Sequence, residues 1–327
     1  MIESKKILVI QTSFLGDAIL ATSILESLHK SNPNYELHLL VRKGNEALFE
    51  GHPFLKTCWV WDKKANKLGN LLRMISAIRS EKFDVIVNVH RYLSSGLITA
   101  LSGAKTRIGF DKNPLSWAFT QSIIHRFNGG HEIDRNHKLI QSLVLMEQAE
   151  KPRLYPTAKD MASVAQFQVN EYVCIAPTSV WNTKQWPKEK WVELIQLLPS
   201  EHKVYLLGAK NDRSICEWIR ANANRDMIEV LAGKLSFLQS AALMAGAKMN
   251  YVNDSAPMHL ASATNAPTTV IYCSTIPGFG FGPLSDRKKI VQLETKLDCR
   301  PCGLHGFNAC PQGHFNCAKE INPRNVL

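Results

Sequence analysis

Short apolar runs alternate with helical segments along most of this 327-residue chain, and this alternation constrains the fold more than any other feature. Residues 5–12 form an apolar run rich in β-branched side chains, and residues 18–30 then repeat apolar side chains at helical spacing. Strands that alternate with helices of this length form parallel βαβ units. The sequence therefore predicts an α/β protein built on doubly wound parallel sheets.

The alternation occurs in two series, and a stretch with two prolines at 151–156 separates them. The first series predicts strands at 36–41, 57–61 and 85–89, a helix at 68–80, an irregular segment at 90–135 and a helix at 137–147. The second predicts strands at 172–176, 204–208, 228–231, 251–252 and 268–273, and helices at 188–198, 212–222, 237–245 and 258–263. We therefore expect one domain at 1–156 and a second at 157–327.

Composition narrows the classes of partner. The formal net charge is +11, but the basic residues are dispersed rather than gathered in a run. A nucleic-acid binder is therefore the weakest interpretation, and a solvated basic surface or an anionic small molecule or lipid is favoured. No window approaches ~18 uninterrupted apolar residues, and the N-terminus lacks a signal-peptide pattern. We expect a cytoplasmic protein without a transmembrane segment.

Two stretches in the second series have the pattern of phosphate-binding turns. Residues 178–187 and 253–260 each follow an apolar strand and lead into a helix. Free backbone N–H groups and the helix dipole make such a terminus a site for an anion. Together the two turns predict a bound nucleoside diphosphate. Taken alone, Asp254 or Ser255 is better explained as a helix N-cap.

A third motif lies where the first strand meets the first helix. Gly16 permits a tight turn there, and Asp17 follows it. Neither a Gly-x-Gly-x-x-Gly fingerprint nor a P-loop is present, which disfavours a dehydrogenase or a kinase. Asp17 is either a functional carboxylate or an acid in the first helical turn that the dipole favours.

The chain resembles the heptosyltransferases of lipopolysaccharide assembly, in glycosyltransferase family 9, nearly end to end. The resemblance rests on the order and spacing of three motifs: Ser13 to Asp17, Lys184 to Pro187, and Asn253 to His259. It implies a GT-B fold, with two Rossmann-like domains that face a central cleft. It also implies an inverting transfer of heptose from ADP-heptose to a lipopolysaccharide inner-core sugar, without a cofactor for catalysis.

The resemblance also implies roles for individual residues. Asp17 would be the general base, worth about 10²–10⁴ in rate. Asp212 would hold the ribose, Leu235 would contact the adenine, and Ala256 replaces the usual glycine of the family. A helix-start role for Asp212 and a core role for His259 are the alternatives. The donor-binding residues implied are Ser179, Lys184, Asp212, Leu235, Asp254, Ser255, Ala256 and His259.

Arginines in the first series suit an anionic acceptor. Arg91 and Arg135 are the acceptor-binding candidates, because guanidinium groups bind phosphates and carboxylates well. Ordinary surface charge is the alternative. The acceptor implied by the resemblance is an anionic glycolipid, so the protein would work in the cytoplasm, peripheral to the inner membrane.

Four cysteines gather in a tail rich in glycine and proline, at 299–317: Cys299, Cys302, Cys310 and Cys317. In a cytoplasmic chain this spacing makes them a candidate structural site for zinc or iron. Free thiols and disulfides are the alternatives. For the whole chain, three alternatives stay open: a protein acceptor, another activated sugar, or a non-catalytic protein that binds nucleotide sugars.

Overall fold

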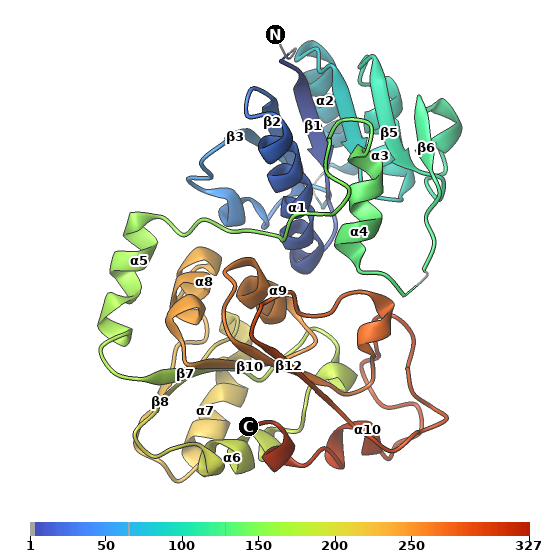
Figure 1. The fold of residues 1–327 in the computed structure, drawn as a ribbon. Coiled ribbons are helices and arrows are strands. Elements are labelled where there is room, and N and C mark those ends of the chain that lie inside the picture. Colours follow the sequence, from blue (N-terminus) through green and yellow to red (C-terminus); the bar gives the residue numbers. More distant parts are fainter. Residues whose placement is uncertain (1–3, 65, 128) are drawn as a thin grey trace. The chain divides into compact units, whose positions relative to one another are not determined.

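A computed structural model describes residues 4–64, 66–127 and 129–327 of the chain. Its internal contacts divide the chain into two compact units, Met1–Tyr155 and Pro156–Leu327. Each unit is a parallel β-sheet with helices packed on it (Figure 1).

The first unit contains a six-stranded sheet in the order β3-β2-β1-β4-β5-β6, with every neighbouring pair parallel. Its strands are β1 (Lys6–Ile10), β2 (Glu36–Arg42), β3 (Leu55–Trp61), β4 (Val85–Asn88), β5 (Thr106–Phe110) and β6 (Gln121–Ile123). Its helices are α1 (Leu15–Ser31), α2 (Lys67–Ser80), α3 (Leu93–Leu101) and α4 (Glu132–His137).

Burial explains why the central strands of this sheet were recognisable as apolar runs. Helices cover both faces of a doubly wound parallel sheet, so its strands have no polar face. Leu8 and Ile10 of β1 and Ile86 of β4 are fully buried, and they pack with Ile78 of α2 in one core cluster.

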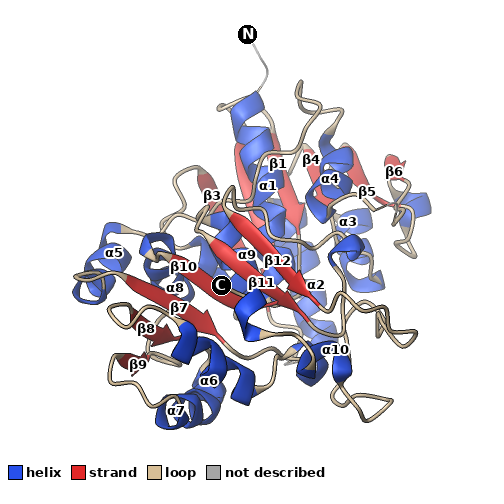
Figure 2. Ribbon diagram, turned by 60° about the horizontal axis from the view of Figure 1, so that its bottom comes forward, coloured by secondary structure: helices blue, strands red, loops and turns tan. Residues whose placement is uncertain are grey.

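The second unit contains another six-stranded parallel sheet, in the order β12-β11-β10-β7-β8-β9 (Figure 2). Its strands are β7 (Tyr172–Ala176), β8 (Lys203–Leu206), β9 (Ile228–Val230), β10 (Met249–Asn253), β11 (Thr268–Tyr272) and β12 (Lys288–Gln292). Its helices are α5 (Ala158–Val164), α6 (Lys188–Leu197), α7 (Arg213–Asn222), α8 (Phe237–Gly246), α9 (Ala256–Ala263) and α10 (Asn316–Lys319).

The helices of the second unit form two layers. Helices α6 and α7 cover one face of the sheet, and α5, α8 and α9 cover the other (Figure 1). Trp191, Leu194 and Ile195 of α6 are fully buried against Ile175 of β7 and Leu206 of β8. This core fixes where α6 begins, and with it the turn that precedes the helix.

The two sheets share one topology, the strand order of the Rossmann fold. Counted within its own unit, each reads 3-2-1-4-5-6, because the chain builds outward from its first strand and then returns to build in the other direction. The order reverses between β1 and β4 in the first sheet, and between β7 and β10 in the second. In sheets of this kind the ligand crevice lies outside the carboxyl ends of the two strands at the reversal. The prediction of two doubly wound parallel sheets is confirmed.

The prediction for the end of the first series was wrong. The helix expected at 137–147 is instead α4, which ends at His137, followed by a 3-10 turn at Lys138–Ile140. The helix starts early because His131 caps it. Beyond the 3-10 turn the backbone bonds to other segments instead: the Tyr35 hydroxyl, in the loop after α1, donates to the Leu143 carbonyl, and the hydroxyl of Ser31, at the end of α1, accepts from the Leu145 N–H. The segment at 90–135, expected to be irregular, contains α3, β5 and β6.

Within the described residues, no helix is both long and apolar enough to cross a membrane.

Buried histidines make the stability of the first unit depend on pH. Burial lowers the pKa of His52 to about 4, and neither ring nitrogen has a hydrogen-bond partner among the described residues. Burial, with Lys63 and Arg91 nearby, lowers the pKa of His90 to about 3. The folded state therefore holds both rings neutral at pH values where an unfolded histidine is protonated.

We predict that the free energy of unfolding falls as pH drops from about 6.5 towards 4, because the unfolded chain takes up these protons first. Above about pH 6.5 each ring is neutral in both states, so this loss is absent there. Replacing His52→Leu should make the pH dependence less steep, as measured by urea unfolding at pH 7 and pH 5. An unchanged pH dependence in the variant would show that His52 is not held neutral.

Candidate functional site

Asp17 lies in the first turn of α1, immediately after β1 at the crevice of the first sheet. Its carboxylate accepts a hydrogen bond from the Phe14 N–H at 3.2 Å, which caps the start of the helix. The side chain is only partly buried. The capping role that the sequence allowed is therefore real. The same bond orients the carboxylate, which remains partly exposed.

A buried ion pair lies near Asp17 in the same unit. Arg135 is 3 % exposed, and its guanidinium contacts the Glu132 carboxylate at 2.7 and 2.8 Å. Burial and, to a smaller extent, the negative charge of Asp17 raise the pKa of Glu132, while Arg135 opposes the rise. The interaction with Asp17 means that α4 brings this pair to the start of α1.

Arg91 belongs to the same region and is more accessible than Arg135. It follows β4, it is partly exposed, and it lies 3.3 Å from Nδ1 of His125. The Arg91 and Arg135 guanidinium groups lie 5.9 and 5.0 Å from the exposed ring of Phe127. Of the two arginines predicted for the acceptor, Arg91 is thus the one open to solvent, and Arg135 is held by Glu132.

Sequence reasoning missed Lys63, which lies after β3 at the carboxyl edge of this sheet. Its ammonium group donates to the Thr12 carbonyl at 2.8 Å. Burial, with the positive charge of Arg42, lowers the pKa of Lys63 to about 8. The hydroxyl of Thr12 in turn lies 3.2 Å from Nδ1 of His90. In the sequence, Lys63 is one of two adjacent lysines and resembles an ordinary surface residue, so only its packing distinguishes it.

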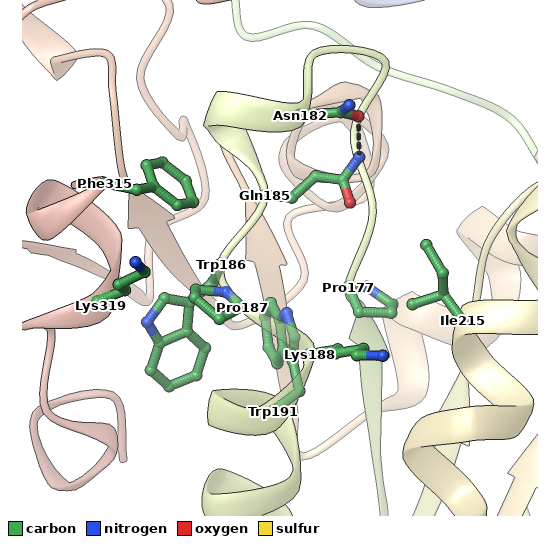
Figure 3. A pocket seen from close by; sticks show the side chains of 10 residues that line it. All are labelled: Pro177, Asn182, Gln185, Trp186, Pro187, Lys188, Trp191, Ile215, Phe315 and Lys319. Atoms are coloured by element: carbon green, nitrogen blue, oxygen red, sulfur yellow. Dashed lines mark hydrogen bonds between the residues drawn. The ribbon is translucent and has the colours of Figure 1, made fainter. Parts of the chain in front are cut away.

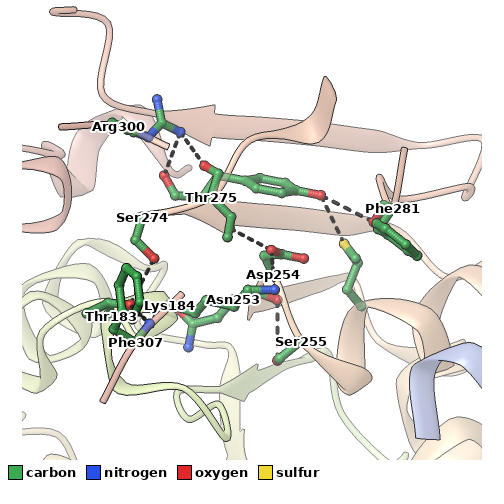
Figure 4. Close-up of polar contacts among 12 residues, drawn as sticks. Thr183, Lys184, Asn253, Asp254, Ser255, Ser274, Thr275, Phe281, Arg300 and Phe307 are labelled. Atoms are coloured by element: carbon green, nitrogen blue, oxygen red, sulfur yellow. Dashed lines mark hydrogen bonds and ion pairs between the residues drawn. The ribbon is translucent and has the colours of Figure 1, made fainter. Parts of the chain in front are cut away.

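In the second unit, a buried ion pair joins the two turns that were predicted to bind phosphate, at 178–187 and 253–260. The ammonium group of Lys184, after β7, lies 2.6 Å from the carboxylate of Asp254, after β10 (Figure 4). The two side chains are 14 % and 8 % exposed. Thr275 donates a further hydrogen bond to this carboxylate at 2.6 Å. The pair lies at the crevice of the second sheet and places a cation beside the start of α9.

Asn253 fastens both ends of the turn that carries Lys184. Its side-chain carbonyl accepts from the Trp186 N–H at 3.0 Å, and its amide donates to the Pro177 carbonyl at 2.8 Å. Asn253 is fully buried. Sequence reasoning included Asn253 in the motif but gave it no role, because hydrogen bonds to a distant backbone have no sequence signature.

The remaining residues of the predicted donor site surround this turn and the first turn of α9. Ser255 is the N-cap position of α9, but its side chain makes no capping bond; its hydroxyl lies 3.4 Å from the Thr178 carbonyl. Ala256 begins the helix and does not have a positive φ, so the glycine of the family pattern is not needed for backbone conformation. The carbonyl of Ser179 accepts from Gln185 at 2.7 Å, and His259 is buried in α9.

Asp212 and Leu235 follow β8 and β9, on the side of β7 away from β10. The carboxylate of Asp212 accepts from the Ala209 N–H at 2.7 Å, which is the helix-start role that the sequence left open. Gly208 makes room for it, because a Cβ there would lie 2.8 Å from the Asp212 side chain. Leu235 is partly exposed. Both are thus at the carboxyl edge, where ligands of such sheets bind.

The turn after β7 also lines a pocket of about 300 Å³ (Figure 3). Three aromatic rings form its walls, and the buried indole N–H of Trp191 has no hydrogen-bond partner in the part of the chain that is described. Ser179, Lys184 and Ser255 do not line it, so the pocket is separate from the predicted diphosphate site. The lining residues are Pro177, Asn182, Gln185, Trp186, Pro187, Lys188, Trp191, Ile215, Phe315 and Lys319.

The four cysteines of the tail lie near one another, and none of the eight in the chain forms a disulfide. Burial comes first in raising the pKa of Cys317 to about 11, and the neighbouring thiols Cys302, Cys310 and Cys299 raise it further. Sγ of Cys299 lies 3.8 Å from Nε2 of His314. Across the described ranges, no group of three or more His, Cys, Asp or Glu side chains has a geometry that could hold a metal ion.

Comparison with known proteins connects these features to one family. A family model described as glycosyltransferase family 9 (heptosyltransferase) matches residues 71–304. Lipopolysaccharide heptosyltransferase 3 of Escherichia coli is 27% identical over 281 residues, which cover 80% of this chain and 82% of that protein.

Two solved structures are similar in fold. The structure of E. coli ADP-heptose lipopolysaccharide heptosyltransferase II aligns with a TM-score of 0.80 at 21% identity, covering 98% of this chain and 96% of that one. A dodecameric iron-containing heptosyltransferase, TibC, in complex with ADP-D-β-D-heptose aligns with a TM-score of 0.60 at 15% identity, covering 99% and 74%. The two sheets are therefore those of a GT-B fold.

We predict that Asn253→Ala lowers the free energy of unfolding by about 2–4 kcal/mol, because it leaves the Trp186 N–H and the Pro177 carbonyl buried without partners. Urea unfolding would measure the change. As a control, Asn222→Ala removes an exposed asparagine at the end of α7 and should change stability by less than about 0.5 kcal/mol. Equal stability of the two variants would mean that Asn253 does not fasten the turn.

Proposed function

Because the chain belongs to glycosyltransferase family 9, we propose that it transfers a heptose from ADP-heptose to a sugar of the lipopolysaccharide inner core. The chain is a glycosyltransferase; the donor, the acceptor and the residue roles are the proposal. The observation that carries the proposal is the position of Lys184: it pairs with Asp254, two residues before α9 begins, at the carboxyl edge of the second sheet. The names of the relatives, a lipopolysaccharide heptosyltransferase and an ADP-heptose complex, support the choice of substrates.

In this proposal the second unit binds the donor. The diphosphate lies against the free N–H groups of the first turn of α9, where the helix dipole favours negative charge. Lys184 retains two N–H donors beyond the one directed at Asp254, so it can bind the phosphates and neutralise the leaving group. Ser179, Ser255, Ala256 and His259 complete this site, and Asp212 and Leu235 hold the ribose and the adenine.

The first unit then supplies the base and binds the acceptor. Asp17 takes the proton of the acceptor hydroxyl as its oxygen attacks the anomeric carbon and the bond to the diphosphate breaks. One carboxylate suffices for this single displacement, which inverts the anomeric configuration. Arg91 binds an anionic group of the glycolipid. Arg135 lies near the same Phe127 ring as Arg91 and helps to hold that ring, and so Arg91, in place. With such an acceptor, the protein acts at the cytoplasmic surface of the inner membrane.

The cysteine tail is proposed as a structural metal site. Four thiols in one tail are a donor set that suits zinc or iron, and the similar TibC is iron-containing, although the described side chains are not grouped closely enough to hold an ion as they stand. Cys299, Cys302, Cys310 and Cys317 would be the ligands, and a fully thiolate-bound ion would hold the tail together rather than touch the substrate.

We predict that Asp17→Asn lowers the rate of transfer about 10²–10⁴-fold while the Kd for ADP stays nearly unchanged, because the change removes only the base. The assay is release of ADP from ADP-heptose with an inner-core acceptor, beside calorimetric titration of ADP. Loss of ADP binding in Asp17→Asn would show that Asp17 has a structural role instead. Release of UDP or GDP from their sugars in preference to release of ADP from ADP-heptose would contradict the proposed donor.

Metal analysis of the purified protein tests whether the cysteine tail binds an ion. We predict about one zinc or iron ion per chain in protein purified without chelator, and its loss in Cys302→Ser, because a tetrahedral site needs all four thiolates. Cys58→Ser alters a cysteine of the first unit and should retain the ion. Metal-free protein with four thiols that react freely would exclude the site.

A further inference from the structure

The cysteine-rich tail contacts the turn that carries Lys184. The hydroxyl of Thr183 accepts a hydrogen bond from the Phe307 N–H at 2.8 Å, and the Thr183 N–H donates to the Phe307 carbonyl at 3.0 Å. Beside them, the Asn182 amide donates to the Asn308 carbonyl at 3.0 Å. Thr183 is 2 % exposed. The residue next to Lys184 is therefore held on both its backbone and its side chain by the tail.

Gly306 shows how closely the tail approaches. Its φ is +76°, and a Cβ at this position would lie 2.8 Å from Oγ1 of Thr183, 3.1 Å from Oγ of Ser274 and 3.4 Å from Cγ of Lys184. Any side chain would push against the turn, in a backbone conformation that already favours glycine. The tail backbone thus fills the space directly against Thr183 and Lys184.

The other end of this tail segment is connected through Thr275 to Asp254, the partner of Lys184. The guanidinium of Arg300 donates to the carbonyls of Cys273 and Thr275, both at 2.7 Å. Figure 4 shows Arg300 beside Thr275. The hydroxyl of Thr275 then donates to Asp254, which pairs with Lys184. Between these two attachments, the Cys302 N–H donates to the Ser274 carbonyl at 2.9 Å, and the Ser274 hydroxyl bonds to Thr183 at 3.0 Å.

We propose that tail residues 300–308 are part of the donor site, because they position Lys184 for the diphosphate. The segment holds Lys184 in two ways. Phe307 binds Thr183, the residue before Lys184. Arg300 binds Thr275, which bonds to Asp254, the ion-pair partner of Lys184. Thr183, Arg300, Gly306 and Phe307 are thus positioning residues that need not touch the ligand. The inference rests on the proposed role of Lys184 in binding the diphosphate.

The test compares two glycines of the tail that share a backbone conformation. Gly306 and Gly313 have φ values of +76° and +73°, but a Cβ at Gly313 meets nothing within 4 Å. Gly306→Ala and Gly313→Ala therefore carry the same conformational strain, and only the first displaces the turn. Calorimetric titration of the full-length variants with ADP should give a Kd about 10-fold or more above the unaltered protein for Gly306→Ala, because misplacement of a binding group is costly. For Gly313→Ala the change should stay within about 2-fold.

A second pair of variants covers the case in which Gly306→Ala does not fold. Thr183→Val keeps the shape of the side chain but removes the acceptor for the Phe307 N–H, whereas Thr183→Ser keeps the hydroxyl. ADP affinity should fall in the valine variant and be largely retained in the serine variant. A merely structural contact would lower the midpoint of thermal unfolding in Thr183→Val and leave the Kd for ADP unchanged, which would overturn the inference.

The outcomes separate this inference from the function on which it rests. If the unaltered protein binds ADP and the two glycine variants lose affinity equally, or not at all, the tail does not position Lys184 and only this inference fails. If the unaltered protein does not bind ADP, the proposed donor site itself is wrong, and the inference falls with it.

Discussion

The buried ion pair between Lys184 and Asp254 is the interaction on which the second unit's site depends. It joins two segments that follow β7 and β10, and these strands are neighbours only because the order of the sheet reverses between them. Taking both charges out of water is costly, and removing one partner of such a pair typically costs about 3–5 kcal/mol. Thr275 donates a hydrogen bond to Asp254, and Asn253 accepts one from the Trp186 N–H at the end of the turn that carries Lys184; both hold the geometry in which that cost is offset.

The same physical rule organises the first unit. Its strand order also reverses, between β1 and β4, and the residues that follow these strands include Asp17 and Arg91. Parallel strands bring all their carboxyl ends to one edge, so polar side chains from distant parts of the sequence gather there. One topology used twice thus gathers different polar groups in the two units: a carboxylate and a guanidinium group at the edge of one sheet, and an ammonium group near a helix start in the other.

The sequence predicted the features that depend on local pattern. Strands buried on both faces, such as β1 and β7, are continuous apolar runs and were recognised. Strand β5 was missed because Arg107 and Gly109 interrupt its apolar pattern, and β12 because it is largely exposed. The helix expected at 137–147 is absent beyond Ile140, where the backbone bonds to the end of α1 and to the loop that follows it. Such contacts between segments are invisible in a local pattern.

The same distinction applies to the site. Asp17, Lys184 and Asp254 were predicted as site residues because their motifs occur in an order that resembles the family. Asn253 and Thr183 act through hydrogen bonds to residues 67 and 124 positions away, which no spacing reveals. The cysteine tail was predicted as a metal site, while its contact with the turn that carries Lys184 is visible only in the structure.

The most direct test of the account replaces the whole ion pair, as Lys184→Met with Asp254→Asn, so that neither charge is left buried alone. Calorimetric titration would compare ADP with adenosine, which shares the base and ribose but lacks the diphosphate. The account predicts that the double variant loses most of its affinity for ADP and keeps its affinity for adenosine. Retention of ADP binding at the affinity of the unaltered protein would contradict the claim that this crevice binds the diphosphate.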